Sequence, residues 1–288
     1  LILIDYPDFN ISLAKVAKKS NVKVFYYISP QVWAWRKKRI NDLARCVDRM
    51  AVILPFEKEV YKRVSLDVGF VGHPLLDTVK RTRSRSEILS ELGLDEDRKT
   101  VAILPGSREK EVTKLLPEML GSAEILKERM PSVQFILPLA DTLPIEMITT
   151  IAENYSVDIK IVRNNDCCNA VGESDMAIVA SGTATLEVAL LEIPMIIVYK
   201  VSPFTYCVGK TFIDVEHIGL VNIIAGKRVV PELIQGDATA GIIAEETEKI
   251  LSDRVLRNRI KEDLRGLRQR LGNPGAAKRT AGLAYELL

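Results

Sequence analysis

The chain has 288 residues, of which 40 are Lys or Arg and 38 are Asp or Glu, so its formal net charge is +2. At roughly 100–200 residues per domain, this length predicts two domains. A composition of 47% hydrophobic and 27% charged residues is typical of globular proteins and excludes global disorder. The near-neutral charge argues against a dedicated nucleic-acid-binding protein. The longest uncharged stretch, Val24–Trp35, is shorter than the roughly 20 residues that a membrane-spanning helix requires.

The chain contains four cysteines, which are Cys46, Cys167, Cys168 and Cys207. None of them forms a C-x-x-C pair, and a chain of this length can bury a core without disulfide bonds. Their pattern therefore predicts a reduced, cytosolic compartment.

Strands and helices are expected to alternate along most of the chain. Apolar runs predict strands at 1–4, 22–28, 50–54, 68–71, 100–104, 133–137, 159–162, 176–179 and 195–199. Helical spacing predicts helices at 9–19, 36–47, 145–154, 168–173 and 184–191, two more after 238, and a last one to 288. Between 104 and 129 we expect Pro117 to separate a short turn from the main helix.

A polar stretch, 80–99, interrupts this alternation and is expected to be a linker that leads into a short helix. The predicted fold class is therefore α/β, with two doubly wound, Rossmann-like domains. We place the first domain at 1–79 and the second at 80–271. The last helix lies in 272–288, and its return to the first domain stays open.

Two loops after predicted strands have the composition of phosphate-binding turns. The first is Gly106-Ser107-Arg108, where a glycine admits an anion to the backbone N–H groups and the arginine offers a forked donor. The second is Ser181-Gly182-Thr183, with Glu187 one helical turn later, placed to accept from ribose hydroxyls. An ordinary turn and a helix cap are the alternatives. Neither loop matches the P-loop or dinucleotide motifs.

Asp5 follows the first predicted strand and is a candidate general base, while Asp8 is a candidate helix cap. His73 follows another strand, where it either contacts a ligand or makes hydrogen bonds within a turn. The run from Gln31 to Arg39 mixes tryptophans with cations, which suits a membrane surface or RNA stacking. A solvated helix start with packed tryptophans is the alternative.

Seven segments now have to be considered as a set. In chain order they are IDYPDFN (Ile4–Asn10), SPQVWAWR (Ser29–Arg36), LPFEKEVY (Leu54–Tyr61), VGHPLLD (Val71–Asp77), LPGSREKEV (Leu104–Val112), ASGTATLE (Ala180–Glu187) and NIIAGK (Asn222–Lys227). As a set, from residue 1 to about 235, they resemble the lipid-A-disaccharide synthase family.

The resemblance implies a glycosyltransferase-B fold with the active site between two Rossmann-like domains. It implies an inverting transferase of lipid A biosynthesis in Gram-negative bacteria, which joins UDP-2,3-diacylglucosamine to 2,3-diacylglucosamine 1-phosphate (lipid X), releasing UDP and forming a β-1,6 disaccharide. It implies no cofactor and no metal, because the UDP-sugar is a substrate. It also implies a peripheral protein on the cytoplasmic face of the inner membrane, and leaves a homodimer open.

Matched residue by residue, the resemblance gives roles to the residues of these segments. Asp5 is implied to be the general base on the acceptor hydroxyl, and Arg108 to stabilise the UDP leaving group. The implied acceptor-side residues are Asp8, Asn10 and His73. The implied nucleotide-sugar-binding residues are Gly106, Ser107, Arg108, Ser181, Gly182, Thr183, Glu187 and Asn222. The implied membrane or lipid surface contains Trp33, Trp35, Arg36 and Lys37.

One expected segment of the family, a glycine-rich GE-x-SGD loop, has no match here, and the chain opens at Leu1 directly on a run that predicts a buried strand. We therefore expect an incomplete first domain, and weak or no transferase activity for the chain as it stands. Two alternatives stay open: a UDP-sugar 2-epimerase of the same fold, and a non-catalytic nucleotide-sugar-binding protein at a membrane surface.

Overall fold

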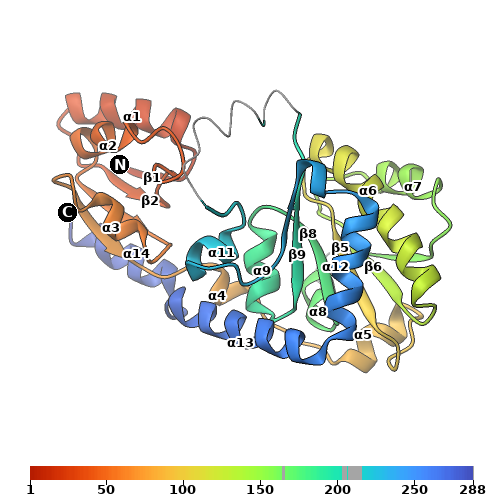
Figure 1. Cartoon of the computed structure of the whole chain (residues 1–288). Coiled ribbons are helices and arrows are strands. Elements are labelled where there is room, and N and C mark those ends of the chain that lie inside the picture. The colour runs from red at the N-terminus through yellow and green to blue at the C-terminus, as the bar shows by residue number, and fades with distance from the viewer. Residues whose placement is uncertain (164–165, 203–205, 207–215, 288) are drawn as a thin grey trace. The chain divides into compact units, whose positions relative to one another are not determined.

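The computed structural model describes residues 1–163, 166–202, 206 and 216–287, and it is an α/β structure with two parallel sheets (Figure 1). Two compact units contain these sheets. Within the described chain, unit 1 contains residues 1–78 and 268–287, and unit 2 contains residues 79–202, 206 and 216–267. The α/β fold class with two parallel-sheet domains is thereby confirmed, while the exact domain limits stay predictions.

Unit 1 contains a four-stranded parallel sheet in the order β1-β2-β3-β4. Its strands are β1 (Ile2–Ile4), β2 (Phe25–Tyr27), β3 (Arg49–Val52) and β4 (Asp67–Phe70). Its helices are α1 (Pro7–Lys19), α2 (Arg39–Cys46), α3 (Glu57–Tyr61), α4 (Leu75–Thr78) and α14 (Ala276–Tyr285).

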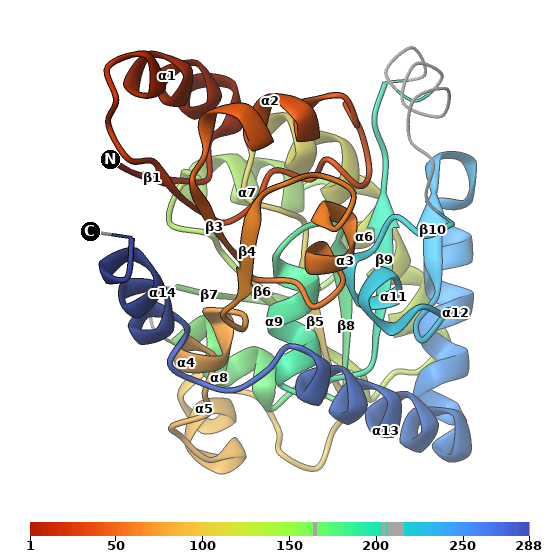
Figure 2. The ribbon, with the colours of Figure 1, turned by 90° about the vertical axis from the view of Figure 1, so that its left-hand side faces the viewer.

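Neighbouring residues of these strands contribute to opposite cores, because side chains alternate across a sheet. Tyr26 and Met50 belong to the core that α1 and α2 cover, whereas Phe25 and Ala51 belong to a smaller one that includes Leu283 of α14. Figure 2 shows α1 and α2 on one side of this sheet and α14 on the other. Burial on both faces explains why β2 and β3 are apolar runs. The expectation that the first strand is buried is wrong for β1, because Leu3 is buried while Ile2 and Ile4 are exposed.

The end of the chain is tied to unit 1 by hydrogen bonds from two arginines. Arg49 of β3 donates to the carbonyl oxygen of Leu283 at 3.3 Å and pairs with Glu286 at 2.7 Å. Arg279 of α14 donates to the carbonyl oxygen of Val71 at 2.8 Å. The last helix is therefore part of the same compact unit as the first strand.

Unit 2 contains a six-stranded parallel sheet in the order β10-β9-β8-β5-β6-β7. Its strands are β5 (Thr100–Leu104), β6 (Gln134–Pro138), β7 (Ile159–Val162), β8 (Met176–Ala180), β9 (Met195–Tyr199) and β10 (Glu232–Ile234). The chain runs outward from β5 through β6 to β7, then returns to pair β8 with the other side of β5. The strand order therefore reverses between β5 and β8, which is where doubly wound sheets bind ligands.

Helices cover both faces of this sheet (Figure 1). They are α5 (Arg85–Glu91), α6 (Glu109–Arg129), α7 (Ile145–Ala152), α8 (Asp166–Gly172), α9 (Ala184–Leu190), α11 (Leu220–Ala225) and α12 (Ala240–Ser252), while a 3-10 turn (Gln235–Asp237) follows β10. Helix α13 (Arg254–Arg270) follows α12, and its residues from 268 belong to unit 1.

The prediction that Pro117 separates a turn from the main helix is wrong. Helix α6 runs without interruption from Glu109 to Arg129 with Pro117 inside it. Its buried stripe begins at Val112 and continues to Leu126 on both sides of the proline. Burying that stripe outweighs the roughly 3 kcal/mol that an interior proline costs a helix.

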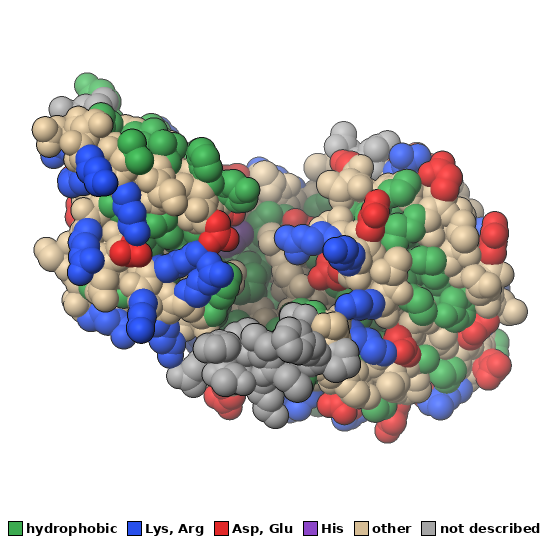
Figure 3. Space-filling model, turned by 90° about the horizontal axis from the view of Figure 1, so that it is seen from above, with side chains coloured by type: hydrophobic (Ala, Val, Ile, Leu, Met, Phe, Trp, Pro, Cys, Tyr) green, Lys and Arg blue, Asp and Glu red, His purple; other side chains and the backbone are tan. Residues whose placement is uncertain are grey.

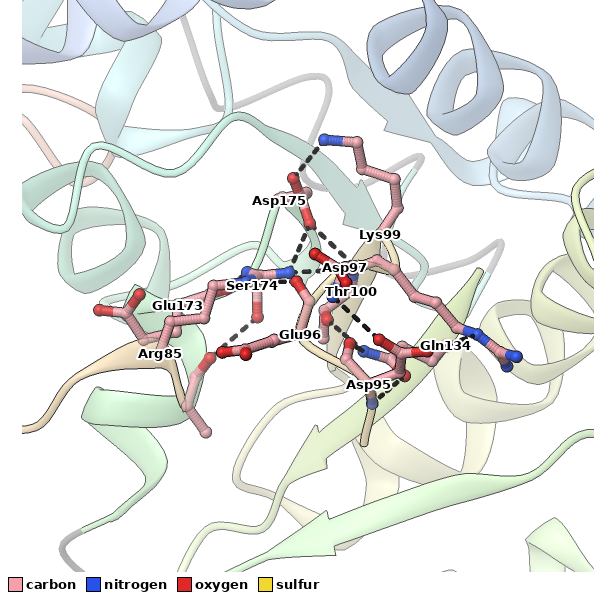
Figure 4. Close-up of polar contacts among 12 residues, drawn as sticks. Arg85, Asp95, Glu96, Asp97, Lys99, Thr100, Gln134, Glu173, Ser174 and Asp175 are labelled. Atoms are coloured by element: carbon pink, nitrogen blue, oxygen red, sulfur yellow. Dashed lines mark hydrogen bonds and ion pairs between the residues drawn. The ribbon is translucent and has the colours of Figure 1, made fainter. Parts of the chain in front are cut away.

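A hydrogen-bond network fastens the amino ends of the central strands of unit 2 (Figure 4). The Asp175 carboxylate accepts from the Thr100 N–H at 3.0 Å, from Lys99 at 2.8 Å and from Arg85 at 3.3 Å. Burial works against ionisation of Asp175, but the hydrogen bonds from Lys99 and Thr100 outweigh it and lower its pKa. Gln134 donates to the Thr100 hydroxyl at 3.0 Å and so ties in β6. The opposite, carboxyl ends remain available for ligands.

Candidate functional site

The two predicted phosphate loops lie next to each other at the carboxyl edge of the unit 2 sheet. Strands β5 and β8 are hydrogen-bonded neighbours, with Leu104 opposite Val179 at their ends. The loop after β5 contains residues 105–108, and the loop after β8 contains residues 181–183. Because the strand order reverses between β5 and β8, these loops flank the position where ligands bind in doubly wound folds.

Gly106 adopts a conformation that only glycine accepts easily. Its φ is +113°, and a Cβ atom there would lie 2.4 Å from Oε2 of Glu111. Burial raises the pKa of Glu111, while the nearby Arg108 opposes that rise. The Glu111 side chain therefore lies against the loop, a contact that sequence reasoning missed because only the turn of α6 brings it back.

The side chains of Ser107 and Arg108 are exposed, and the Arg108 guanidinium makes no hydrogen bond or ion pair to the described residues. Arg108 is the N-cap residue of α6, with an extended backbone. The carbonyl oxygen of Ser107 accepts from the hydroxyl of Thr142 at 2.8 Å, which fastens the loop from outside. The loop thus has a fixed backbone and a free cation.

In the second loop, the hydroxyls of Ser181 and Thr183 do not cap α9, and they make no hydrogen bond among the described residues. Thr185 instead donates to the carbonyl oxygen of Gly182 at 2.7 Å. Gly182 is exposed, and a Cβ atom added there would meet nothing within 4 Å. The alternative that these hydroxyls serve as caps is therefore excluded, and both are free to bind a ligand.

Glu187 lies one turn into α9 and is half-buried. Its carboxylate has no hydrogen bond or ion pair to any described residue, and burial raises its pKa. A carboxylate in such a place is costly unless a donor reaches it. Ligand hydroxyls would supply that donor.

Asn222, in α11, is fully buried, and its side-chain amide uses all its hydrogen-bonding capacity within unit 2. It donates to the carbonyl oxygen of Val230 at 2.9 Å and to Glu232 at 2.8 Å, and accepts from the N–H groups of Val229 and Val230. This finding corrects the prediction of a direct nucleotide-sugar contact, because the amide already fastens α11 to the segment before β10.

In unit 1, Asp5 directly follows β1 and is exposed, with a left-handed backbone of φ 48°. Asn10, predicted on the acceptor side, is buried, and its amide donates to the carbonyl oxygens of Ile4 at 3.1 Å and of Asp5 at 2.8 Å. These two hydrogen bonds from the Asn10 side chain to the backbone of Ile4 and Asp5 could not be predicted from the sequence.

Asp8 lies in the first turn of α1 and forms ion pairs with Arg36, at 3.0 Å, and Arg39. The hydrogen bond from Arg39 is the main cause that lowers the pKa of Asp8. The Arg36 guanidinium also lies over the ring of Trp35, 4.5 Å from its centroid. Asp8 is therefore an ion-pair partner, and the alternative that its side chain caps α1 is excluded.

Trp33 is half-buried and packs edge-on against Phe56 with ring centroids 5.0 Å apart. Glu57 lies buried at the start of α3 and accepts from the N–H of Leu54 at 3.0 Å. Burial raises the pKa of Glu57 to about 7. The burial of Glu57 could not be predicted from the sequence, because the two residues that follow it, Lys58 and Glu59, are charged.

His73, predicted on the acceptor side, is the turn histidine of the alternative hypothesis. It is buried, its ring Nδ1 accepts from the N–H of Leu75 at 3.2 Å, and its backbone N–H donates to the carbonyl oxygen of Leu271 at 3.0 Å. Burial lowers its pKa to about 4. It is therefore a neutral, structural group at physiological pH.

Hydrophobic and basic side chains share the face of unit 1 that Figure 3 shows at the left. Tyr6, Phe9 and Trp35 are exposed by 69%, 58% and 41%, and Arg36 and Lys37 are exposed beside Trp35. No helix in the described part of the chain is long and apolar enough to cross a membrane. Across the same residues, no three His, Cys, Asp or Glu side chains come together as a metal site.

Cys46, Cys167 and Cys168 are free thiols, and Cys207 lies outside the described residues.

The fold defines the class of protein. It is similar to a UDP complex of MnaA from Staphylococcus aureus, with a TM-score of 0.67 and 11% identity over 100% of this chain and 76% of that chain. It is also similar to WaaG, a glycosyltransferase involved in lipopolysaccharide biosynthesis, with a TM-score of 0.56 and 12% identity over 94% and 80% of the two chains. These likenesses define a fold of the glycosyltransferase-B class.

The family follows from the sequence comparisons. A family model described as lipid-A-disaccharide synthetase matches residues 1–285. Lipid-A-disaccharide synthases from Syntrophus aciditrophicus and Coxiella burnetii are 54% and 42% identical over 100% of this chain, which spans 75% and 76% of their lengths. The chain belongs to the lipid-A-disaccharide synthase family, a family of glycosyltransferases.

Replacing Gly106 tests whether the first loop depends on its left-handed glycine. We expect Gly106→Ala to lower the free energy of unfolding by about 1–2 kcal/mol, because alanine is strained at φ +113°. Gly182→Ala is the matched control, with open space and no left-handed backbone. Urea unfolding measures both. Recovery of full stability in Gly106→Ala combined with Glu111→Ala would mean that the clash, not the backbone, is the cause.

Two buried groups of unit 1 predict opposite pH dependences. The folded pKa of His73 lies below its unfolded value, so His73 destabilises the protein as pH falls below about 6.5. The pKa of Glu57 in the folded protein lies above its value in the unfolded chain. Glu57 therefore contributes to stability at low pH, and this contribution is lost as pH rises from about 4.5 through 7. Urea unfolding at pH 5 and pH 8 separates the two.

We compare the free energy of unfolding of each variant with that of the wild type. For His73→Asn we expect this difference to be roughly 2 kcal/mol more favourable at pH 5 than at pH 8, because asparagine keeps an acceptor for the N–H of Leu75 without titrating. For Glu57→Gln we expect a difference of similar size in the opposite direction, so that this variant is more stable relative to the wild type at pH 8 than at pH 5. Shifts of the same sign in both variants contradict this assignment.

Proposed function

We propose that this protein transfers 2,3-diacylglucosamine from UDP-2,3-diacylglucosamine to the 6-hydroxyl of 2,3-diacylglucosamine 1-phosphate, giving a β-1,6 disaccharide and UDP. Its family membership supports this reaction. The structural observation that carries it is the pairing of β5 with β8, which sets two glycine-containing loops side by side where the strand order reverses.

Unit 2 binds the nucleotide part of the donor in this proposal. The diphosphate lies against the backbone at Gly106 and the free hydroxyls of Ser181 and Thr183, while the ribose hydroxyls donate to Glu187. The hydroxyls of Ser181 and Thr183 and the carboxylate of Glu187 make no hydrogen bond among the described residues, which supports the assignment. At the first loop, the Arg108 guanidinium makes no hydrogen bond or ion pair to a described residue.

The chemical step needs a base and a cation. Asp5 removes the proton from the acceptor hydroxyl as its oxygen forms a bond to C1 of the donor sugar. The bond between C1 and the diphosphate oxygen breaks, and the electron pair leaves with UDP. Arg108 stabilises the negative charge that develops on that leaving group. Attack on the face opposite the leaving group inverts the configuration at C1.

Unit 1 also supplies a membrane-facing surface in this proposal, which we define as Tyr6, Phe9, Trp35, Arg36 and Lys37. Both sugar substrates carry acyl chains and reside in a bilayer. Exposed aromatic rings beside cations suit the headgroup region of an anionic membrane. The protein accordingly works as a peripheral protein on the cytoplasmic face of the inner membrane.

Activity assays test the proposed roles directly. With both lipid substrates, we expect Asp5→Asn to abolish disaccharide formation and Arg108→Ala to lower kcat by about 10²–10³. Asparagine tolerates a left-handed backbone, and the exposed Arg108 side chain makes no hydrogen bond or ion pair to a described residue, so neither variant should unfold. Lys114→Ala, also an exposed cation on α6, is the matched control and should retain activity.

UDP release without disaccharide contradicts the proposed reaction. Epimerisation of UDP-N-acetylglucosamine at C2 would instead support the epimerase alternative.

Vesicle sedimentation tests the membrane-facing surface. With vesicles of phosphatidylcholine and phosphatidylglycerol, we expect Phe9→Ala combined with Trp35→Ala to weaken binding about tenfold or more, because two exposed rings no longer insert. Val255→Ala is the control, since Val255 is 79% exposed but lies on α13 in unit 2. Equal binding by all three proteins contradicts the assignment.

A further inference from the structure

Asp5 and Tyr6 adopt left-handed backbone conformations in succession, with φ of 48° and 43°. Left-handed geometry is unfavourable for residues with a Cβ atom, and Asp5 and Tyr6 are the one adjacent pair of such residues in the described chain. Strain of this kind persists only where the surroundings over-determine it. The question is therefore what holds this turn.

Two buried side chains hold it from within unit 1, and both donate to the same atom. The carbonyl oxygen of Asp5 accepts from the hydroxyl of Tyr26 at 2.6 Å and from the amide of Asn10 at 2.8 Å. Tyr26 is fully buried on β2, and Asn10 is buried on α1. The backbone adds bonds from Asp5 N–H to Tyr27 and from Asn10 N–H to Tyr6. With its carbonyl oxygen fixed inward, the Asp5 side chain is left exposed.

The Tyr26 hydroxyl is a dependable donor. Burial raises the pKa of Tyr26, so the hydroxyl keeps its proton through the physiological range. Removing one partner of a buried hydrogen bond costs more than the bond itself is worth. The turn therefore responds strongly to the loss of this single oxygen atom.

We propose that Tyr26 and Asn10 are positioning residues, which hold Asp5 in the left-handed conformation that directs its carboxylate away from the core and toward the acceptor. This inference rests on the proposed function of Asp5 as the base. Neither residue touches the substrate, and each acts through the backbone of Asp5. Asn10 thereby gains a role different from the direct acceptor contact expected of it.

A second buried tyrosine provides the matched control. Tyr61 is as buried as Tyr26, but its hydroxyl bonds to Ser29 at 2.8 Å and not to the Asp5 turn. Tyr26→Phe and Tyr61→Phe each delete one buried hydroxyl from the same core. A general loss of stability affects both variants alike, whereas a positioning role affects only Tyr26→Phe.

The test measures kcat, KM and amide hydrogen exchange in each variant. We expect Tyr26→Phe to lower kcat about tenfold with KM for the UDP-sugar unchanged. We also expect the backbone N–H of Asn10, which donates to Tyr6, to exchange about tenfold faster. Tyr61→Phe should change neither.

Two results overturn the inference: an unchanged kcat in Tyr26→Phe, or an equal loss of kcat in Tyr61→Phe. A wild-type protein that makes no disaccharide contradicts the proposed function instead. In that event, exchange alone decides whether Tyr26 holds the turn, since equal exchange in both phenylalanine variants overturns that claim too.

Discussion

Parallel strand pairing is the constraint on which the rest of this structure depends. Every strand pair in both sheets is parallel, so within each sheet all the carboxyl ends meet at one edge. Parallel strands require crossover helices, which bury both faces and leave only the edges for chemistry. In unit 2 the network around Asp175 occupies the amino edge, and the candidate nucleotide loops occupy the carboxyl edge. In unit 1 the carboxyl edge carries Asp5.

The predicted site residues divide into two groups by what their side chains already bond. In the described part of the chain, the side chains of Arg108 and Glu187 make no hydrogen bond or ion pair, and Glu187 is half-buried, so a ligand can supply a partner for each. Asn10, Asn222 and His73 are buried and bonded inward, so they shape the backbone around the site. A family motif therefore mixes residues that meet the ligand with residues that hold the loops in place.

Much of the fold could be predicted from the sequence, because strands buried on both faces form apolar runs that stand out, such as those of β5, β8 and β9. The short elements α11 and β10 could not, since they depend on Asn222 bonding to Glu232 ten residues later. Pro117 misled the prediction because local propensity says nothing of the core that α6 covers. The roles of Asn10 and Tyr26 were equally hidden, because a bond between β2 and the end of β1 exists only in the folded sheet.

The central claim is that the loops after β5 and β8 together form the nucleotide site. A crystal structure of the protein with UDP tests it most directly. We predict that the diphosphate lies against residues 106–108 and 181–183, with a ribose hydroxyl donating to Glu187. A UDP molecule bound at another edge of the sheet, or a Glu187 carboxylate still without a partner in the complex, would contradict the account.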